Sequence, residues 1–411
     1  MVSRRRFLKT TAATALMGAG VGYSGAKVFA ETGTIKIGTI FDLSGGLEIY
    51  GKPPADAAVL ALEDINAAGG LLGSKVEAIA FDSQSNMQLY TQYAQELAVK
   101  YQVAAAHAGI TSASREVMRP IFRRFKVPYF YNMQYEGGVC DRNTFVTGVT
   151  PAQTVEKLVP HVMKLWGKKV YQISADYNYG QIISKWVRKY VQENGGEIVG
   201  NDFLPLDVTE FGPTIAQIAA SKCDIVWSSL VGGAHMSFYR QWGAGGMLSK
   251  VPIASTTFGL GNEHIVLDPS EVNGMRVSYN YFQEIDTPAN IAFVKRWHER
   301  FGSGYPYISE LGMSTYQGIM LWAEAVKVAG STEREAITKA LESGIGIDAP
   351  SGRVTFHPPT HHVLVDVHIA EVRDRKMNVV ETFSQAMPSD TAAVCDLIKN
   401  PDDNQQYEPK L

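Results

Sequence analysis

Short apolar runs alternate with amphipathic segments along the chain from residue 34 onward. The run "TIKIGTIFDL" (34–43) alternates apolar and polar residues and then turns apolar, which is typical of a buried strand. In "ADAAVLALEDINAAGG" (55–70) the apolar residues share one helical face, the two preceding prolines suit a first turn, and the closing glycines supply a left-handed stop. The same patterns predict strands at 76–82, 103–106 and 127–132, with helices through 89–97 and from 112 onward. This order predicts a parallel sheet flanked by helices.

The same sequence of elements restarts near Pro151. The patterns predict strands at 168–174, 197–205, 224–230 and 251–256, with helices at 155–167, 181–196, 211–221 and 237–246. The helix ends "NAAGG" and "ENGG" are each followed by a strand, so the two halves look alike. We therefore predict an α/β protein with two Rossmann-like parallel-sheet lobes.

Polar, hydroxyl-rich segments follow the predicted strands. In open parallel sheets, ligands lie beyond the carboxyl ends of the strands, so these segments are expected to converge on one cleft between the lobes. They are residues 109–114, 131–136, 176–180, 228–233 and 255–257. The stretch "GITSASREV" (109–117) opens a helix, and its free N–H groups with the Thr111 and Ser112 hydroxyls suit a carbonyl, carboxylate or amide oxygen. The alternative is a plain Ser/Thr helix cap.

The first thirty residues have the features of an export signal. Ser3 to Lys9, "SRRRFLK", fits the twin-arginine pattern, and small residues before Glu31 suit cleavage. The apolar stretch 10–23 is too short and too rich in glycine and alanine for a membrane anchor. We predict a twin-arginine signal peptide at 1–30 and a periplasmic location.

Composition excludes some classes of protein. The 411 residues are 45% apolar and 19% charged, which indicates a folded chain of two or more domains. Without the signal peptide, 33 basic residues remain against 41 acidic ones, a net charge of −8. A mildly acidic exported protein is a poor candidate for nucleic-acid binding. The basic cluster Arg119, Arg123, Arg124 and Lys126 is predicted to be a solvated face, with a protein-docking surface as the alternative.

Cysteines and histidines give no sign of a metal site. Cys223 precedes the apolar run "DIVWSSL" and is expected to be a buried thiol, whereas Cys140 and Cys395 could form a disulfide. No CxxC spacing exists, so structural zinc is not expected. The histidines 357, 361 and 362 are expected on an exposed loop rather than around a metal.

Motifs of catalysis are also missing from the sequence. No GxSxG elbow and no phosphate-binding GxxxxGK[ST] occur, and no acidic pair has spacing that demands acid/base chemistry. An exported amide hydrolase would need a base beside its nucleophile, and the motif order gives Ser112 no obvious histidine. We expect no enzyme activity, no catalytic residue, no metal and no cofactor.

Several motifs together carry a resemblance to a known family. "TSASREVMRPIF", "YFYNMQYEGG", "SADYNYG" and "GIDAPSGRVTFHPPTHHV" occur in the order seen in periplasmic amide- and urea-binding proteins. These are type I, leucine-binding-like solute receptors of ABC transporters, and the similarity covers the whole mature chain. The resemblance implies a solute-binding component of an ABC importer that takes a small amide or urea-like ligand and docks on an inner-membrane permease. Branched-chain or other amino acids and small carboxylates are the alternative ligands.

The resemblance also implies which residues touch the ligand. Thr111 and Ser112 would grip the ligand oxygen. The other implied contacts are Ile110, Tyr131, Gln134 and Tyr135 from the first lobe, and Asp176, Tyr177, Tyr179, Val231, Gly232 and Thr257 from the second. Ile110 replaces the aromatic residue usual in this branch, and the second-lobe loop ends in Gly180 where the branch has proline. Both departures predict more room than urea needs.

The charge of the ligand follows from the acidic residues. None lies in "ITSAS" or in "YNMQY", so the ammonium of an amino acid would need Glu136, Asp176 or Glu263 as its partner. A neutral amide or urea-like compound is therefore the first choice, and an amino acid the second.

The resembled fold has three crossovers between lobes. They are expected here near Thr150, Tyr281 and Asp348. The first lobe would comprise 31–149 plus 282–347, and the second 150–281 plus 348–411. Ligand binding would close the hinge, and the permease would recognise the closed form.

Overall fold

The computed structural model describes residues 33–305 and 307–409. The predicted signal peptide (1–30), with its twin-arginine motif, lies outside the described residues. Within the two described ranges, no helix combines the length and apolar character needed to cross a membrane.

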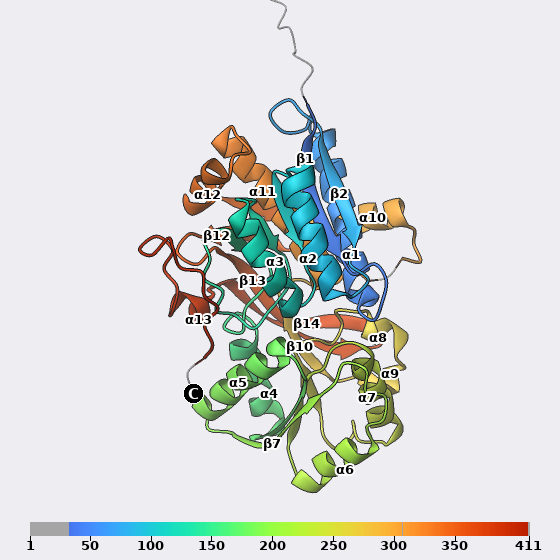
Figure 1. Cartoon of the computed structure of the whole chain (residues 1–411). Helices are drawn as coiled ribbons and strands as arrows, with labels where there is room; N and C mark the ends of the chain where they lie inside the picture. Colours follow the sequence, from blue (N-terminus) through green and yellow to red (C-terminus); the bar gives the residue numbers. More distant parts are fainter. Residues whose placement is uncertain (1–32, 306, 410–411) are drawn as a thin grey trace, which may run out of the picture. The chain divides into compact units, whose positions relative to one another are not determined.

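The first lobe is built on five parallel strands. In spatial order they are β2 (Val76–Asp82), β1 (Ile35–Phe41), β3 (Ala105–Ala108), β4 (Tyr129–Tyr131) and β5 (Thr144–Val146). The helices α1 (Glu48–Ala67), α2 (Met87–Gln95) and α3 (Ser112–Arg124) follow β1, β2 and β3 (Figure 1). A π-helix, η1 (Glu96–Tyr101), extends α2. The predicted parallel arrangement is confirmed, although the three-residue strand β5 had no signal in the sequence.

The second lobe repeats this plan. Its parallel strands are β10 (Arg276–Tyr279), β9 (Ile253–Ser255), β8 (Ile225–Ser229), β6 (Lys169–Ala175) and β7 (Glu197–Leu204). Its main helices are α4 (Val155–Trp166), α5 (Asn178–Glu193), α6 (Gly212–Ser221) and α7 (Gly233–Ala244). Strand β8 is buried along its whole length, as expected for a strand covered on both faces.

Strand β13 (His362–Arg373) lies between the two groups of parallel strands. It pairs with β5 at His362 and, antiparallel, with β10 at residues 368–371. Around it lie β11 (Gly346–Ala349), β12 (Gly352–His357) and β14 (Lys376–Ala386), all in antiparallel pairs. The sheet is therefore mixed, and these strands were not predicted from the pattern.

The remaining helices cover the sheet or connect its strands. They are α8 (Glu263–Val266), α9 (Pro269–Val272), α10 (Pro288–Phe301), α11 (Glu310–Ala329), α12 (Arg334–Glu342) and α13 (Ser389–Ala392). Helix α11 packs against α1 and α12 (Figure 1), and fifteen of its twenty residues are buried. A helix that is apolar or small on nearly all sides belongs inside the protein rather than on its surface.

The start of α1 differs from the prediction. The helix begins at Glu48, so Pro53 and Pro54 lie inside it rather than in its first turn. A side chain at Gly51 would lie 1.9 Å from the Asp42 carbonyl oxygen, so the helix passes directly against the end of β1.

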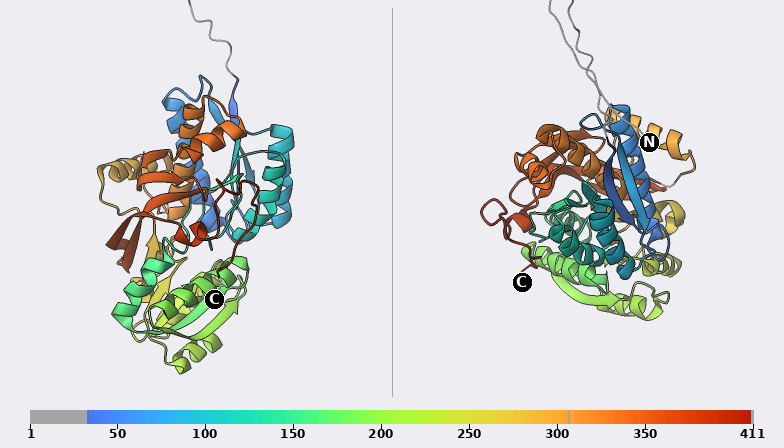
Figure 2. Two further views of the ribbon diagram at one scale, coloured as in Figure 1. Left: turned by 90° about the vertical axis from the view of Figure 1, so that its left-hand side faces the viewer. Right: turned by 45° about the horizontal axis from the view of Figure 1, so that its top comes forward.

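The C-terminal segment (387–409) is tied to the loop that follows β4. Cys140 and Cys395 form a disulfide, and Cys140 also donates its N–H to the Gln405 carbonyl at 2.9 Å. The Tyr407 N–H donates to the Gly138 carbonyl at 2.8 Å, and the segment ends beside α5 (Figure 2). The disulfide that the sequence left open is therefore formed, and Cys223 is a buried free thiol as predicted.

Candidate ligand-binding site

A small cavity of about 50 Å³ lies where loops of the two lobes meet. Nine of the predicted contacts line it, namely Ile110, Thr111, Ser112, Tyr131, Gln134, Tyr177, Tyr179, Val231 and Thr257. Four other residues line it as well: Met133 lies in the predicted segment 131–136 but was not singled out, and the sequence did not indicate Tyr50, Leu260 or Leu311. The structure thus brings most of the predicted residues together, and their contact with a ligand stays a prediction.

The start of α3 forms the polar end of the cavity. Thr111 Oγ1 accepts the Ser114 N–H at 3.1 Å, and Ser114 Oγ accepts the Thr111 N–H at 3.1 Å, a reciprocal cap. Thr111 is therefore a helix cap and a cavity residue at once. Ser112 takes no part in the cap, so its side chain needs another explanation.

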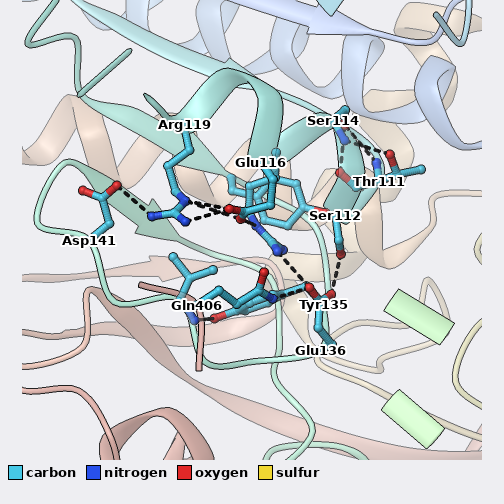
Figure 3. Close-up of polar contacts among 12 residues, drawn as sticks. Thr111, Ser112, Ser114, Glu116, Arg119, Tyr135, Glu136, Asp141 and Gln406 are labelled. Carbon is cyan, nitrogen blue, oxygen red and sulfur yellow. Dashed lines mark hydrogen bonds and ion pairs between the residues drawn. The ribbon is translucent and has the colours of Figure 1, made fainter. Parts of the chain in front are cut away.

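Ser112 belongs to a buried ionic network behind the cavity (Figure 3). Its hydroxyl donates to Glu136 Oε2, while Glu136 Oε1 accepts from Arg115 Nη2 at 2.8 Å and from Gln406 Nε2. Burial alone would lower the pKa of Arg115, but the adjacent Glu136 carboxylate raises it well above the usual range. Arg115 and Glu136 are both fully buried, so the network holds a charge pair away from water.

None of the described residues that line the cavity carries a charge. The three acids considered as partners of an ammonium group are all engaged elsewhere. Glu136 pairs with Arg115, and exposed Asp176 accepts from Gln181 Nε2 at 3.0 Å. Buried Glu263 accepts the N–H groups of Gly259 and Gly261, and burial raises its pKa to about 7. None of these three acids reaches the cavity lining.

Polar contacts join the two lobes beside the cavity. Gln134 Nε2 donates to the Thr256 carbonyl at 2.5 Å, and Trp186 Nε1 donates to the Glu136 carbonyl at 2.9 Å. Gln134 and Glu136 follow β4, whereas Thr256 follows β9 and Trp186 lies on α5. Hydrogen bonds thus cross from one lobe to the other next to the cavity.

Tyr135 does not line the cavity, contrary to the expectation. Its hydroxyl lies 2.5 Å from His362 Nε2 and accepts the Val139 N–H at 3.1 Å. His362 Nδ1 donates to the Thr360 carbonyl at 2.6 Å, which leaves Nε2 to accept the Tyr135 proton. Tyr135 therefore supports the loop from behind.

The expectation that the three histidines lie on an exposed loop is also wrong for two of them. His361 and His362 are buried, and His361 Nε2 lies 3.1 Å from Glu342 Oε1. In the described part of the chain, no group of three His, Cys, Asp or Glu side chains could hold a metal ion.

The buried His362 predicts a dependence of stability on pH. Burial lowers its pKa to about 3 from an ordinary value of 6.5. Below pH 6.5 the unfolded chain binds a proton that the folded protein does not, so this contribution to stability is lost as the pH falls from 6.5 towards 3. From pH 7 to 5.5, the free energy of unfolding should fall by about 1.3 kcal/mol more in the wild type than in His362→Gln. Urea unfolding of both proteins at pH 7 and pH 5.5 checks this. An equal fall in the free energy of unfolding for the wild type and His362→Gln would contradict the prediction.

Gly232 and Gly180 have structural explanations. Gly232, at φ 76°, precedes α7 outside the cavity lining, and a Cβ there would lie 2.9 Å from the Leu206 carbonyl oxygen. A Cβ on Gly180 would lie 1.9 Å from the Ala175 carbonyl oxygen. Gly180 therefore lets α5 approach β6 and adds no room for a ligand, contrary to the expectation. Of the two positions that depart from the pattern of the resembled branch, Ile110 and Gly180, only Ile110 lines the cavity.

The basic cluster at the end of α3 is only partly exposed. Arg123, Arg124 and Lys126 are exposed as predicted, but Arg119 is buried, where it pairs with Glu116 at 2.6 Å and Asp141 at 3.2 Å. Arg115, one helical turn earlier, was missed. A signal existed, because residues 112, 115 and 119 share one face of a helix.

Comparisons with known proteins agree with this architecture. The model of the periplasmic binding protein family matches residues 34–376. The Leu/Ile/Val-binding protein homolog 6 of Brucella melitensis is 24% identical over 346 residues, covering 82% of this chain and 87% of that protein.

Solved structures show the same fold. A solute-binding protein of Rhodopseudomonas palustris HaA2 in complex with p-hydroxybenzoic acid has a TM-score of 0.77 and 24% identity, covering 88% of this chain and all of that one. The Leu-, Ile-, Val-, Thr- and Ala-binding protein of Brucella ovis has a TM-score of 0.76 and 21% identity, covering 87% of this chain and 97% of that one. The chain belongs to the periplasmic binding protein family and has the two-lobe fold of these solute-binding proteins.

Proposed function

We propose that the protein binds a small neutral amide or urea-like compound between its lobes and delivers it to an ABC permease. The observation that carries this proposal is the absence of charge from the described cavity lining. Four tyrosines and a group of apolar side chains form most of the wall. The remaining lining residues are the polar Thr111, Ser112, Gln134 and Thr257. Such a site can pair the amide of a small ligand without leaving a buried charge unpaired.

Amino acids and small carboxylates are the second candidates. Relatives named for leucine, isoleucine and valine, and neighbours solved with benzoates, favour them. A zwitterion needs a carboxylate for its ammonium group, and Glu136, Asp176 and Glu263 are all engaged outside the lining. We therefore rank these ligands below neutral amides.

The amide-hydrolase alternative finds no catalytic base. Ser112 donates to Glu136, and the charge of that carboxylate is paired with Arg115. That carboxylate is committed to the buried ion pair with Arg115 and also accepts from Gln406. We propose that Ser112 binds the ligand and does not attack it.

The hinge that closes over the ligand would consist of three segments. The chain leaves β5 for α4 near Thr150 and leaves β10 for α10 near Tyr281. For the third crossing we favour β13 over the segment near Asp348, because β13 pairs with β5 at one end and β10 further along. We further propose that the permease recognises the closed form and that the "SRRRFLK" motif directs twin-arginine export.

A thermal-shift experiment tests the ligand class. The mature protein is heated with acetamide, urea, leucine or 4-hydroxybenzoate. A ligand at a hundred times its Kd adds about 2.7 kcal/mol, which raises the Tm of a protein of this size by about 3 °C. We expect acetamide or urea to raise the Tm. A shift with leucine or 4-hydroxybenzoate alone would favour the second class of ligands.

A further inference from the structure

Ser112 Oγ is a polar atom of the cavity wall whose proton has a defined partner. A serine hydroxyl has one proton to donate and two lone pairs that can accept. Glu136 already receives hydrogen bonds from Arg115 and Gln406 on Oε1, and its Oε2 faces Ser112 Oγ (Figure 3). A carboxylate in an ion pair can only accept, so the Ser112 proton points at Glu136 and away from the cavity.

The Tyr131 hydroxyl is the competing acceptor for this proton. It lies close enough to Ser112 to interact, and it donates its own proton to the Ile110 carbonyl at 3.1 Å. Hydrogen bonds to a charged acceptor are about twice as strong as those between neutral groups. The Ser112 proton therefore goes to the Glu136 carboxylate rather than to Tyr131, and Ser112 offers only lone pairs to the cavity.

Thr111 has the opposite polarity. Its Oγ1 accepts the Ser114 N–H, which leaves its proton free to donate. The N–H groups of Ser112 and Ala113, at the first turn of α3, have no intrahelical acceptor and add further donors. The end of the cavity thus presents an acceptor at Ser112 next to donors.

We infer that Glu136 fixes Ser112 as a hydrogen-bond acceptor, so that the cavity selects ligands carrying an N–H or O–H donor for Ser112 next to an acceptor for Thr111. This inference rests on the proposed function and narrows its ligands to primary amides and urea-like compounds. A ketone of the same shape offers only the acceptor, and a carboxylate would place its second oxygen against the lone pairs of Ser112. Glu136 and Arg115 are positioning residues, because they act through Ser112.

Titration of the wild type with three ligands of one shape tests the inference. Propionamide carries donor and acceptor, butanone has a methyl group in place of the NH2, and propionate has two acceptors. We expect propionamide to bind about 5- to 150-fold more tightly than butanone, because butanone leaves the buried Ser112 lone pair unpaired. Propionate should also bind more weakly than propionamide.

Glu136→Gln reverses the polarity. Arg115 can only donate, so the side-chain carbonyl of the introduced amide must face Arg115 and its NH2 must face Ser112. Ser112 then accepts from this NH2, and its own proton, no longer held by a carboxylate, turns to the cavity or to the Tyr131 hydroxyl, so the ratio of propionamide to butanone affinity should fall. The matched control is Asp141→Asn, which removes the buried partner of Arg119 in the same network and should keep the wild-type ratio.

Ser112→Ala keeps the test decisive if Glu136→Gln does not fold. Without the acceptor, propionamide loses its advantage over butanone, and the ratio approaches one. Equal binding of propionamide and butanone by the wild type, or an unchanged ratio in folded Glu136→Gln, overturns the inference and leaves the neutral ligand class standing. Failure of the wild type to bind any of the three overturns the proposed function, and the inference with it.

Discussion

Replacing Cys140 and Cys395 together by alanine should lower the free energy of unfolding by about 2–5 kcal/mol. The disulfide joins residues 255 apart, and it restricts the unfolded chain more than a short loop would. It also ties the C-terminal segment to the loop carrying Glu136, where Gln405, Gln406 and Tyr407 make their hydrogen bonds. Loss of the disulfide should therefore loosen these contacts as well.

Denaturant unfolding of the oxidised protein and of the double variant measures this difference. The control is Cys223→Ala, which removes the buried free thiol and leaves the disulfide intact. A double variant as stable as Cys223→Ala would show that the C-terminal segment contributes little to stability.

Arg115→Met should destabilise the protein by about 3–5 kcal/mol, because it leaves the buried Glu136 carboxylate without its counter-charge. Methionine keeps much of the arginine volume, so the loss of charge dominates the effect. Arg119→Met is the matched control on the same helix. Its closer partner Glu116 is 30% exposed and can be hydrated after the change, and its other partner, buried Asp141, keeps the hydrogen bond from the Asn143 N–H, so a smaller loss is expected.

The double variant Arg115→Met, Glu136→Gln separates charge from packing. With both charges removed, much of the lost stability should return. Two results would contradict this role of the buried Arg115–Glu136 pair. One is that Arg115→Met lowers the free energy of unfolding no more than Arg119→Met does, and the other is that the double variant regains no stability.

The parallel core of each lobe could be predicted because its strands are short apolar runs followed by amphipathic helices. Strand β13 could not, since it is buried on both faces at His368 to Ala370 and its partners β5, β10 and β14 come from distant parts of the chain. The three residues of β5 are too few for any pattern.

The candidate site also contains residues that could be predicted from the sequence and residues that could not. Residues directly after β3, β4 and β6 were predicted, because parallel strands place their carboxyl ends at one edge. Tyr50 and Leu311 come from α1 and α11, which only tertiary packing brings to that edge. Tyr135 was expected beside Gln134, but it turns to the buried His362, which had been expected on an exposed loop.

Isothermal titration of the mature protein with isovaleramide and with leucine tests the central claim most directly. Isovaleramide shares the branched side chain of leucine and carries neither its ammonium nor its carboxylate. An uncharged cavity predicts saturable binding of isovaleramide at one site per protein, with leucine at least about tenfold weaker, because its charges would be buried unpaired. Submillimolar binding of leucine with no detectable binding of isovaleramide would contradict the account.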